Sequence, residues 1–392
     1  MNPSCSKIAI THLTCHLRTL GGMQSVLQHH LTHDGDSGFE ARQISFFERA
    51  DPAPGLVDAL GWNGWWTICQ MRHAADAVFR RRPGGVAVYH NCWGVPFLAD
   101  LDGADRRLSY VHGIPPGMGA NLKAQKGSLD GIIAVSQAQA DLAARCLPEL
   151  SPERISIVPL PINPRIQDFR HSRMNNRPVI IGYSGRLVKD IKRIDRLPEL
   201  ARRLSNAGVD FRLEVLGNGC DGPWLKKQFS GNEKVIFHGP KSGDDYWKIL
   251  ARWDLQINTS DSEGTPVSIL EGLSCAVIPI FPGIDSGGVD YARRVHPNLV
   301  YTPGDMTAAA QSINELKRMP AAELDSLRVK CRESVHSHTP DAYQNAFRSF
   351  VEKISALPRI SGQVFENRPF YLTDRIPLGI LSRFLPASLL KK

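Results

Sequence analysis

The sequence lacks the features that mark several classes of protein. It contains no C-x-x-C pair, and its eight cysteines stand singly, which argues against a zinc site and against a disulfide framework. No run of about 18 uninterrupted apolar residues occurs, so no transmembrane helix is predicted. The start of the chain lacks the basic end and apolar run of a signal peptide. These absences favour a protein of the reducing cytoplasm.

Positive charge is in excess. With 47 Lys and Arg against 39 Asp and Glu, the 392-residue chain carries a formal net charge of +8. Nucleic acid, an anionic membrane surface and phosphorylated small molecules would all be attracted by it, although a protein can be basic without any of them. The basic residues are spread out, and no zinc-finger, helix-turn-helix or ribonucleoprotein pattern occurs, so nucleic-acid binding is not predicted.

Short apolar runs alternate with helical patterns along most of the chain, which is typical of parallel-sheet α/β architecture. Strands are predicted at residues 7–13, 86–89, 107–111, 131–135 and 155–158, and again at 179–183, 211–216, 235–237, 255–259, 276–280 and 299–301. The proline-rich stretch 159–164 and the polar stretch 170–177 separate the two series.

The break predicts two domains of similar size. We expect an N-terminal domain of residues 1–165, a C-terminal domain of residues 176–345, and a final helix and tail of residues 346–392. Ligands of open α/β sheets bind at the carboxyl ends of strands, so a cleft between the two domains is the predicted site.

Residues 254–280 carry the strongest site signal. A strand ends in a polar loop, and a helix follows over residues 266–274 with Pro266 at its first position. The N–H groups and dipole at that helix start suit an anion or a cluster of hydroxyls. Glu271 lies inside this otherwise apolar helix, where an unpaired carboxylate is costly unless it accepts hydrogen bonds. Sugar or ribose hydroxyls would donate them, and the alternative is a surface glutamate at the helix edge.

A second signal is a glycine-rich turn followed by cations. The strand at residues 179–183 runs into Gly185, and four basic residues follow at Arg186, Lys189, Lys192 and Arg193. Guanidinium and ammonium groups beside such a turn suit a diphosphate, although a solvated basic helix start would look the same.

Glycines and histidines after other strands give weaker signals. Gly21 and Gly22 precede a predicted helix at residues 22–31, and paired glycines let backbone approach a ligand closely. His112 stands at the carboxyl end of a strand before a Gly/Pro loop, which suits proton or hydrogen-bond chemistry, and His90 is placed similarly but less strongly. Most of the 13 histidines are expected to be structural.

Two further motifs are not assigned to a site. The glycines at positions 217, 219 and 222 match the dinucleotide fingerprint, but they lie in the middle of the second domain and Pro223-Trp224 follows at once. Asp34-Gly35-Asp36 has the form of a metal-binding Asp-x-Asp motif, but it lies in a Gly/Ser/Asp loop where a solvated turn is expected.

Taken in order, these segments resemble glycosyltransferase family 4, a retaining family of the glycosyl transferases group 1 type with the GT-B fold. The resemblance covers most of residues 7–345. It rests on the glycine loop, the strand-end histidine, the basic pair and the paired glutamates, that is on Gly21-Gly22, Val111-His112-Gly113, Gly185-Arg186-Leu187 with Lys192, Phe237-His238-Gly239, and Glu263-Gly264-Thr265-Pro266 through Glu271. The paired glutamates and the Arg/Lys pair are its more specific parts.

The resemblance implies two Rossmann-like domains facing each other across a cleft, with the acceptor on the N-terminal domain. It implies transfer from a nucleotide sugar, such as a UDP- or GDP-sugar, with retention of configuration and without metal or cofactor. Arg186 and Lys192 would stabilise the leaving diphosphate, and Glu271 would hold the ribose.

The same resemblance assigns the transferred sugar to Glu263 and His112. Glu263 would hold it together with the backbone of residues 264–266, and His112 would bond to one of its hydroxyls. The nucleotide base would rest near residues 238–241. The donor-binding residues implied in this way are Gly21, Gly22, Gly185, Gly239, Gly264, Thr265, Pro266 and Glu271.

The sequence departs from the family pattern in places. Lys192 lies one residue further from Arg186 than usual, so Lys189 is a rival for its role. Val289 follows Gly287-Gly288 where the family commonly has a glutamate. A nucleotide-sugar epimerase with the same fold, or a non-catalytic nucleotide-sugar-binding protein, are the alternatives to a transferase.

Two segments bear on the acceptor. Residues 61–82 place three tryptophans before a basic cluster, and residues 359–392 form a basic and apolar tail. Both suit the inner face of a membrane near a lipid-linked or lipopolysaccharide acceptor. Core packing of the tryptophans, and a tail that straps across the domains, are the alternatives. We therefore predict a cytoplasmic transferase of cell-surface polysaccharide or lipopolysaccharide synthesis, with peripheral membrane association.

Overall fold

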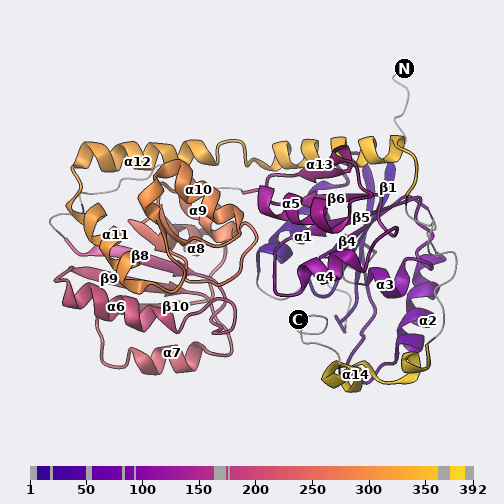
Figure 1. Cartoon of the computed structure of the whole chain (residues 1–392), viewed down its shortest axis with the longest axis horizontal. Coiled ribbons are helices and arrows are strands. Elements are labelled where there is room, and N and C mark those ends of the chain that lie inside the picture. The colour runs from indigo at the N-terminus through magenta and orange to yellow at the C-terminus, as the bar shows by residue number, and fades with distance from the viewer. Residues whose placement is uncertain are drawn as a thin grey trace. The chain divides into compact units, whose positions relative to one another are not determined.

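The computed structural model describes residues 7–17, 21–49, 55–81, 84–91, 94–162, 174, 177–360 and 371–384. The chain forms two compact units, labelled by element in Figure 1. The first domain comprises residues 1–161 and 341–392, and the second comprises residues 162–340. Each is built on one parallel sheet with helices between its strands, which confirms the predicted α/β class. Most of the predicted linker lies outside the described residues.

The first domain has a seven-stranded sheet in the order β3-β2-β1-β4-β5-β6-β7. Its strands are β1 Ile8–Thr14, β2 Phe39–Ser45, β3 Val57–Ala59, β4 Val86–His90, β5 Arg106–Val111, β6 Gly131–Ala134 and β7 Ile155–Ile157. Its helices are α1 Gly22–His33, α2 Ile68–Phe79, α3 Val95–Leu98, α4 Met118–Lys123, α5 Gln137–Cys146, α13 Pro340–Ala356 and α14 Leu378–Phe384. Strands β2 and β3 were not predicted, because Glu40, Arg42 and Gln43 interrupt the apolar pattern of β2 and because β3 is only three residues long.

The second domain has a six-stranded sheet in the order β10-β9-β8-β11-β12-β13. Its strands are β8 Val179–Ser184, β9 Phe211–Leu216, β10 Val235–Gly239, β11 Leu255–Ile257, β12 Ile278–Pro282 and β13 Val300–Tyr301. Its helices are α6 Arg196–Asn206, α7 Gly222–Gln228, α8 Gly243–Leu250, α9 Val267–Ser274, α10 Gly287–Val295, α11 Met306–Arg318 and α12 Ala321–Ser334. Six strands were predicted here, and all six are present.

Two predicted helix starts are wrong by one to three residues. The residue pattern predicts a helix over residues 193–207, but α6 begins at Arg196, because Arg193 adopts a left-handed φ of 48° and its guanidinium bonds to Asp195 and Asp261. Pro266 is the N-cap of α9 and not its first residue, since its ψ of 119° is extended.

The end of the chain packs on the first domain. Helix α13 buries Tyr343, Phe347 and Val351, and Ile354 at its end accepts a hydrogen bond on its carbonyl from Arg106. The described part of the tail lies against the loop before α2, where the Gly379 N–H donates to the Gly64 carbonyl at 2.7 Å and the Leu378 N–H donates to the Trp66 carbonyl at 2.9 Å. A Cβ on Gly379 would lie 3.0 Å from the Gly64 carbonyl oxygen, so a glycine at position 379 favours this close contact.

One glycine of β8 can be tested as a packing constraint on the second domain. A Cβ on Gly182 would overlap the ring of Trp253, which is fully buried. We expect Gly182→Ala to lower the free energy of unfolding by about 1–3 kcal/mol through overpacking. Gly35→Ala is the control, because nothing lies near the Cβ added there. Denaturant unfolding measures both, and an unchanged midpoint for Gly182→Ala would contradict the packing described.

Candidate functional site

The strand order of the second sheet reverses between β8 and β11. From β8 the chain builds outward through β9 and β10, and from β11 it builds outward in the other direction. Parallel strands end at the same edge, so the loops after β8 and β11 meet at the point where ligands of such sheets bind. Two hydrogen bonds join them: Asp261 N–H to the Ile191 carbonyl at 2.9 Å, and Thr259 Oγ1 to the Lys192 carbonyl at 2.8 Å.

These loops bring Lys192 and Glu263 together. The Lys192 Nζ lies 2.5 Å from the Glu263 Oε1, and both side chains are mostly buried. Ser260 Oγ donates to the same oxygen at 2.6 Å, and Asn258 Nδ2 lies 3.4 Å from it. A carboxylate in a partly desolvated site is thereby held by three donors, one of them charged.

Lys189, the rival for the role of Lys192, has different partners. Its Nζ lies 3.8 Å from an oxygen of Asp221 and 3.8 Å from the centre of the Trp224 ring. Its backbone N–H also donates to Asp221. Lys192 is therefore the lysine in contact with Glu263, and Lys189 is paired with Asp221.

Arg186 stands on a loop that glycines hold in place. Gly217 has a φ of 131°, and a Cβ on it would overlap the Gly185 carbonyl, while a Cβ on Gly219 would overlap Leu187. The Leu187 N–H donates to the Asn218 carbonyl at 2.8 Å. The glycines that match the dinucleotide fingerprint thus seat the Arg186 loop. The Arg186 side chain is exposed, and within the described ranges it forms no ion pair with Glu263 or Glu271.

Glu271 lies on α9, partly exposed and with a desolvated carboxyl group. Tyr246 of α8 donates a hydrogen bond of 2.5 Å to its Oε2. Burial raises the pKa of Glu271 to about 7, against the opposing effect of the Tyr246 hydrogen bond. One donor to Glu271 is thus supplied by the protein itself, and the carboxylate can accept further hydrogen bonds.

The turn that leads into α9 is held by hydrogen bonds from the start of α10. The Gly264 carbonyl accepts hydrogen bonds from Ser286 Oγ at 2.5 Å and from the Gly287 N–H at 3.0 Å. Thr265 is buried, and Pro266 offers no side-chain cap to the helix start. Gly239, at the end of β10, accepts a hydrogen bond on its carbonyl from Gly217 at 2.9 Å. The predicted donor-site residues numbered above 184 therefore surround the carboxyl ends of β8, β10 and β11.

The other predicted residues belong to the first domain. Gly21 is the N-cap of α1 and Gly22 is its first residue. His112 directly follows β5, its N–H donates to Asn91 Oδ1 at 2.8 Å, and its Nε2 lies 2.7 Å from Nδ1 of His90.

The prediction of a solvated turn at Asp34 is wrong. Asp34 is fully buried, because its carboxylate accepts hydrogen bonds from His12 at 3.1 Å and from His30 at 2.8 Å, while Asp36 is exposed. His12, His30 and Asp34 form the one group of three in the described part of the chain with the spacing of metal ligands. The i, i+4 spacing of His30 and Asp34 was the signal available in the sequence.

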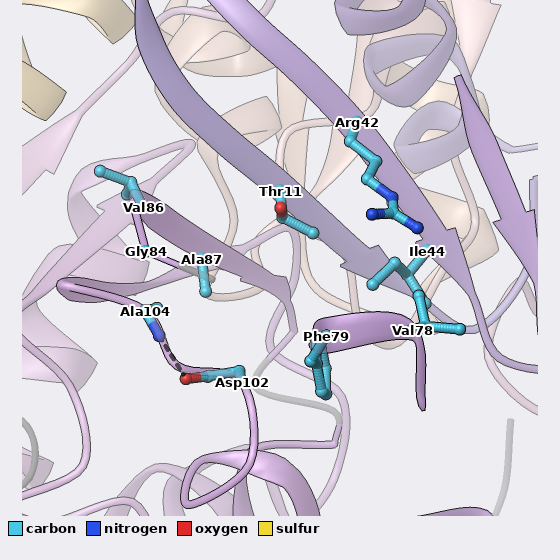
Figure 2. Close-up of a pocket in the computed structure, with 10 residues that line it drawn as sticks. All are labelled: Thr11, Arg42, Ile44, Val78, Phe79, Gly84, Val86, Ala87, Asp102 and Ala104. Atoms are coloured by element: carbon cyan, nitrogen blue, oxygen red, sulfur yellow. Dashed lines mark hydrogen bonds between the residues drawn. The ribbon is translucent and has the colours of Figure 1, made fainter. Parts of the chain in front are cut away.

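A small pocket of the first domain is a poor candidate. Thr11, Gly84, Val86 and Asp102 are among its lining residues, as Figure 2 shows, which places it near the amino ends of β4 and β5. Its charged groups are already paired, Asp102 with Arg107 and Arg42 with Asp58. Ligands of parallel sheets bind at the opposite edge.

The raised pKa of Glu271 can be tested through stability. An ionised carboxylate is less stable in the folded domain than in the unfolded chain when folding raises its pKa from 4.5 to about 7. Its cost therefore grows as pH rises through this window and is complete above pH 7. We expect Glu271→Gln to raise the free energy of unfolding by about 1–3 kcal/mol at pH 8, with a smaller gain at pH 5. Equal gains at both pH values in denaturant titrations would contradict the raised pKa.

Comparisons with known proteins bear on the fold and on the second domain. Residues 164–336 match the family model described as glycosyl transferases group 1. No curated protein matches the chain in sequence.

Solved structures match over most of the chain at low identity. The apo form of the lipopolysaccharide outer core galactosyltransferase WaaB has a TM-score of 0.67 at 15% identity, over 88% of this chain and 99% of that one. Anabaena HepE in complex with UDP and glucose has a TM-score of 0.69 at 14% identity, over 89% and 100%. The N-terminal domain of Candida albicans trehalose-6-phosphate phosphatase has a TM-score of 0.68 at 15% identity, over 88% and 97%. The chain therefore has the GT-B fold, and most of its second domain matches the glycosyl transferases group 1.

Proposed function

We propose that the protein is a retaining, metal-independent glycosyltransferase that moves a sugar from a nucleoside-diphosphate sugar to a saccharide or lipid-linked acceptor. The observation that carries the proposal is the Lys192–Glu263 pair beside the start of α9, with Glu271 on the same helix. The family match of residues 164–336 and the resemblance to glycosyltransferase family 4 support it.

Positive charge at the leaving group is supplied by side chains in this mechanism. Breaking the bond to the sugar leaves negative charge on the diphosphate, which Arg186 and Lys192 stabilise in place of a cation. Lys192 is neutralised by Glu263 before the donor binds, whereas Arg186 has no ion pair within the described ranges. Arg186 therefore meets the diphosphate with its full charge.

The two glutamates bind different hydroxyl groups. Glu271, ionised above pH 7, accepts hydrogen bonds from the ribose, and Tyr246 orients its carboxylate. Glu263 and the backbone of residues 264–266 hold the transferred sugar, and His112 of the first domain bonds to one of its hydroxyls. No cofactor takes part.

Donor turnover tests this assignment. The purified protein is incubated with UDP-, GDP- and ADP-sugars in EDTA, and free nucleotide is measured. We expect release from one donor, and a loss of about 100- to 1000-fold in Arg186→Ala and Lys192→Ala, as is typical when one stabilising group is removed. Lys189→Ala is the matched control and should stay within about threefold, because Lys189 pairs with Asp221.

Other results would redirect the proposal. Activity that EDTA abolishes and a divalent metal restores would contradict metal independence. Conversion of the donor into an isomer without an acceptor would identify an epimerase. Binding of a nucleotide sugar without turnover, with any acceptor, would identify a non-catalytic protein.

We further propose that an exposed apolar patch of the first domain rests on an anionic membrane surface near a lipid-linked acceptor. The patch, here the tail patch, consists of Trp65 and four tail residues: Tyr371, Leu372, Ile376 and Ile380. Trp65 is 82% exposed and Leu372 is 84% exposed. Large apolar side chains this exposed on one surface mark interaction sites.

Backbone contacts of the tail bring part of it close to Trp65. Thr67 bridges to Pro377, and Gly379 bonds to Gly64, so the tail lies beside Trp65. Trp62 is buried against Phe46 and Trp66 packs partly buried on the same core, so Trp65 is the tryptophan of this segment that is left for the proposed contact. The tail from residue 356 onward carries six basic and two acidic residues, a charge that favours anionic lipid. No helix within the described ranges has the length and apolar character to cross a membrane.

Vesicle flotation tests the tail patch. We expect the protein to float with vesicles containing anionic lipid at low salt, and the double variant Trp65→Ser, Leu372→Ser to bind at least about tenfold more weakly, since each side chain is worth about 1.5–3 kcal/mol when fully buried. Val329→Ser, an exposed apolar residue of the second domain, is the control and should float like the unaltered protein. Flotation that is absent, or equal in the double variant, would contradict the proposal.

A further inference from the structure

Three histidines lie on neighbouring strands of the first sheet. His12 is in β1, His90 ends β4, and His112 follows β5. His12 pairs with Val88, so His90 lies two residues beyond the residue opposite His12. His90 pairs with Tyr110, so His112 likewise lies two residues beyond the residue opposite His90. Side chains two residues apart in a strand share a face of the sheet. The three rings therefore form a diagonal row across the strands where the strand order of this sheet reverses.

Hydrogen bonds link the row to a buried carboxylate. His90 Nδ1 lies 2.7 Å from His112 Nε2, His90 Nε2 lies 3.1 Å from His12 Nδ1, and His12 Nε2 lies 3.1 Å from Asp34 Oδ2. The other oxygen of Asp34 accepts from His30 Nδ1 at 2.8 Å and from Gln344 Nε2 at 3.2 Å. His12, His30, Asp34 and His90 are all buried.

The protonation states of these groups follow from burial and contact. Burial alone would raise the pKa of Asp34, but the charge of His30 and the hydrogen bonds from His12 and His30 outweigh it and hold that pKa well below its ordinary value. Burial lowers the pKa of His12 to about 4 and the pKa of His90 well below its ordinary value. At neutral pH the row therefore starts from an ionised carboxylate and continues through two neutral imidazoles.

An ionised carboxylate can only accept, and a neutral imidazole has one N–H and one lone pair. The proton of His12 must therefore be on Nε2, and its Nδ1 accepts from His90. The proton of His90 is then on Nε2, and its Nδ1 accepts from the Nε2–H of His112. Each hydrogen bond in the row can therefore run in only one direction, so the Asp34 carboxylate determines the tautomer of His112 at the other end of the row.

We propose that Asp34, His12 and His90 are positioning residues that fix His112 in the Nε2–H tautomer, so that its Nδ1 offers a lone pair to a hydroxyl of the donor sugar. The proposal rests on the proposed function for the identity of that hydroxyl. The opposite tautomer would present an N–H in the same place and would demand an acceptor from the sugar. Outer partners of this kind fix tautomer and ring orientation in metal-bound histidines.

A metal ion at His12, His30 and Asp34 gives the opposite result. These three residues have the spacing of metal ligands. A metal on His12 Nε2 would move the His12 proton to Nδ1, which would reverse both following hydrogen bonds and put the His112 proton on Nδ1. The hydrogen-bond distances between Asp34 and both histidines favour the metal-free arrangement.

Nitrogen NMR on the full-length protein decides between the two. Protein labelled with ¹⁵N-histidine is studied at neutral pH, and the His112 signals are assigned by their loss in His112→Gln. We expect the proton on Nε2 and a lone pair on Nδ1. A His112 proton on Nδ1, or a doubly protonated ring, would overturn the proposal. One equivalent of bound metal in the same sample, found by mass spectrometry, would also overturn it.

Variants at His12 distinguish its proposed positioning of His112 from a contribution of its side chain to packing. His12→Leu interrupts the row, and we expect kcat for nucleotide release to fall by about 10- to 100-fold with little change in donor KM, the usual effect of losing an outer partner. His12→Gln keeps a donor toward Asp34 and an acceptor toward His90, and it should restore kcat to within about threefold of wild type.

His30→Gln is the matched control. His30 is as buried as His12 and bonds to the same carboxylate, but it lies off the path to His112. We expect kcat within about threefold of wild type, because a glutamine four residues before an aspartate can keep that hydrogen bond. A loss in His30→Gln equal to that in His12→Leu would assign the effect to packing and overturn the proposal. If no nucleotide sugar is turned over by the wild type, the proposed function fails, and the NMR result still decides the tautomer.

Discussion

The parallel strands of each sheet impose the constraint on which the rest of the structure depends. All strands of such a sheet end at one edge, so residues far apart in the sequence meet there without any long excursion of the chain. Lys192 and Glu263 are 71 residues apart, and His12 and His90 are 78 apart, yet each pair is in hydrogen-bond contact. In both domains the contact lies where the strand order reverses.

The desolvated carboxylates of the two domains, Asp34 and Glu271, differ in how many hydrogen-bond donors surround them. In the first domain the Asp34 carboxylate is fully enclosed and has a donor at each oxygen, which lets the fold keep a buried charge. In the second domain Glu271 has one strong donor and a pKa near neutrality. A desolvated carboxylate with unused acceptor capacity costs stability wherever no further donor reaches it.

Much of the second domain could be predicted from the sequence. Its strands are short apolar runs between turn residues, and the glutamates and cations stand at fixed distances after two of them, so pattern alone located the loops that meet. Pattern could not distinguish Lys192 from Lys189, because that choice depends on Asp221 and Trp224, which lie in another segment. The helix start at Arg196 was missed for a similar reason, since Asp261 holds Arg193 out of helical geometry.

The first domain was harder to predict. The polar residues of β2 break the apolar pattern that predicts a strand, although β2 pairs with β1 on one side and β3 on the other. Asp34 was expected to be exposed to solvent because it lies in a Gly/Ser/Asp loop. Its burial depends on His12 of β1, His30 of α1 and Gln344 of α13, three segments that composition does not connect. Buried polar clusters are in general the features that single-sequence patterns describe worst, because their partners come from the tertiary fold.

The discontinuous first domain has a consequence for the order of synthesis. Its helix α13 comes after almost the whole of the second domain in the chain, and it supplies Tyr343, Gln344 and Phe347 to the neighbourhood of Asp34. On the ribosome the second domain is therefore complete while the first still lacks one wall of its core. Domains generally fold as units during translation, with the N-terminal one first. Here the N-terminal domain is the one that must wait, with the Asp34 carboxylate and its histidines open to water until α13 emerges.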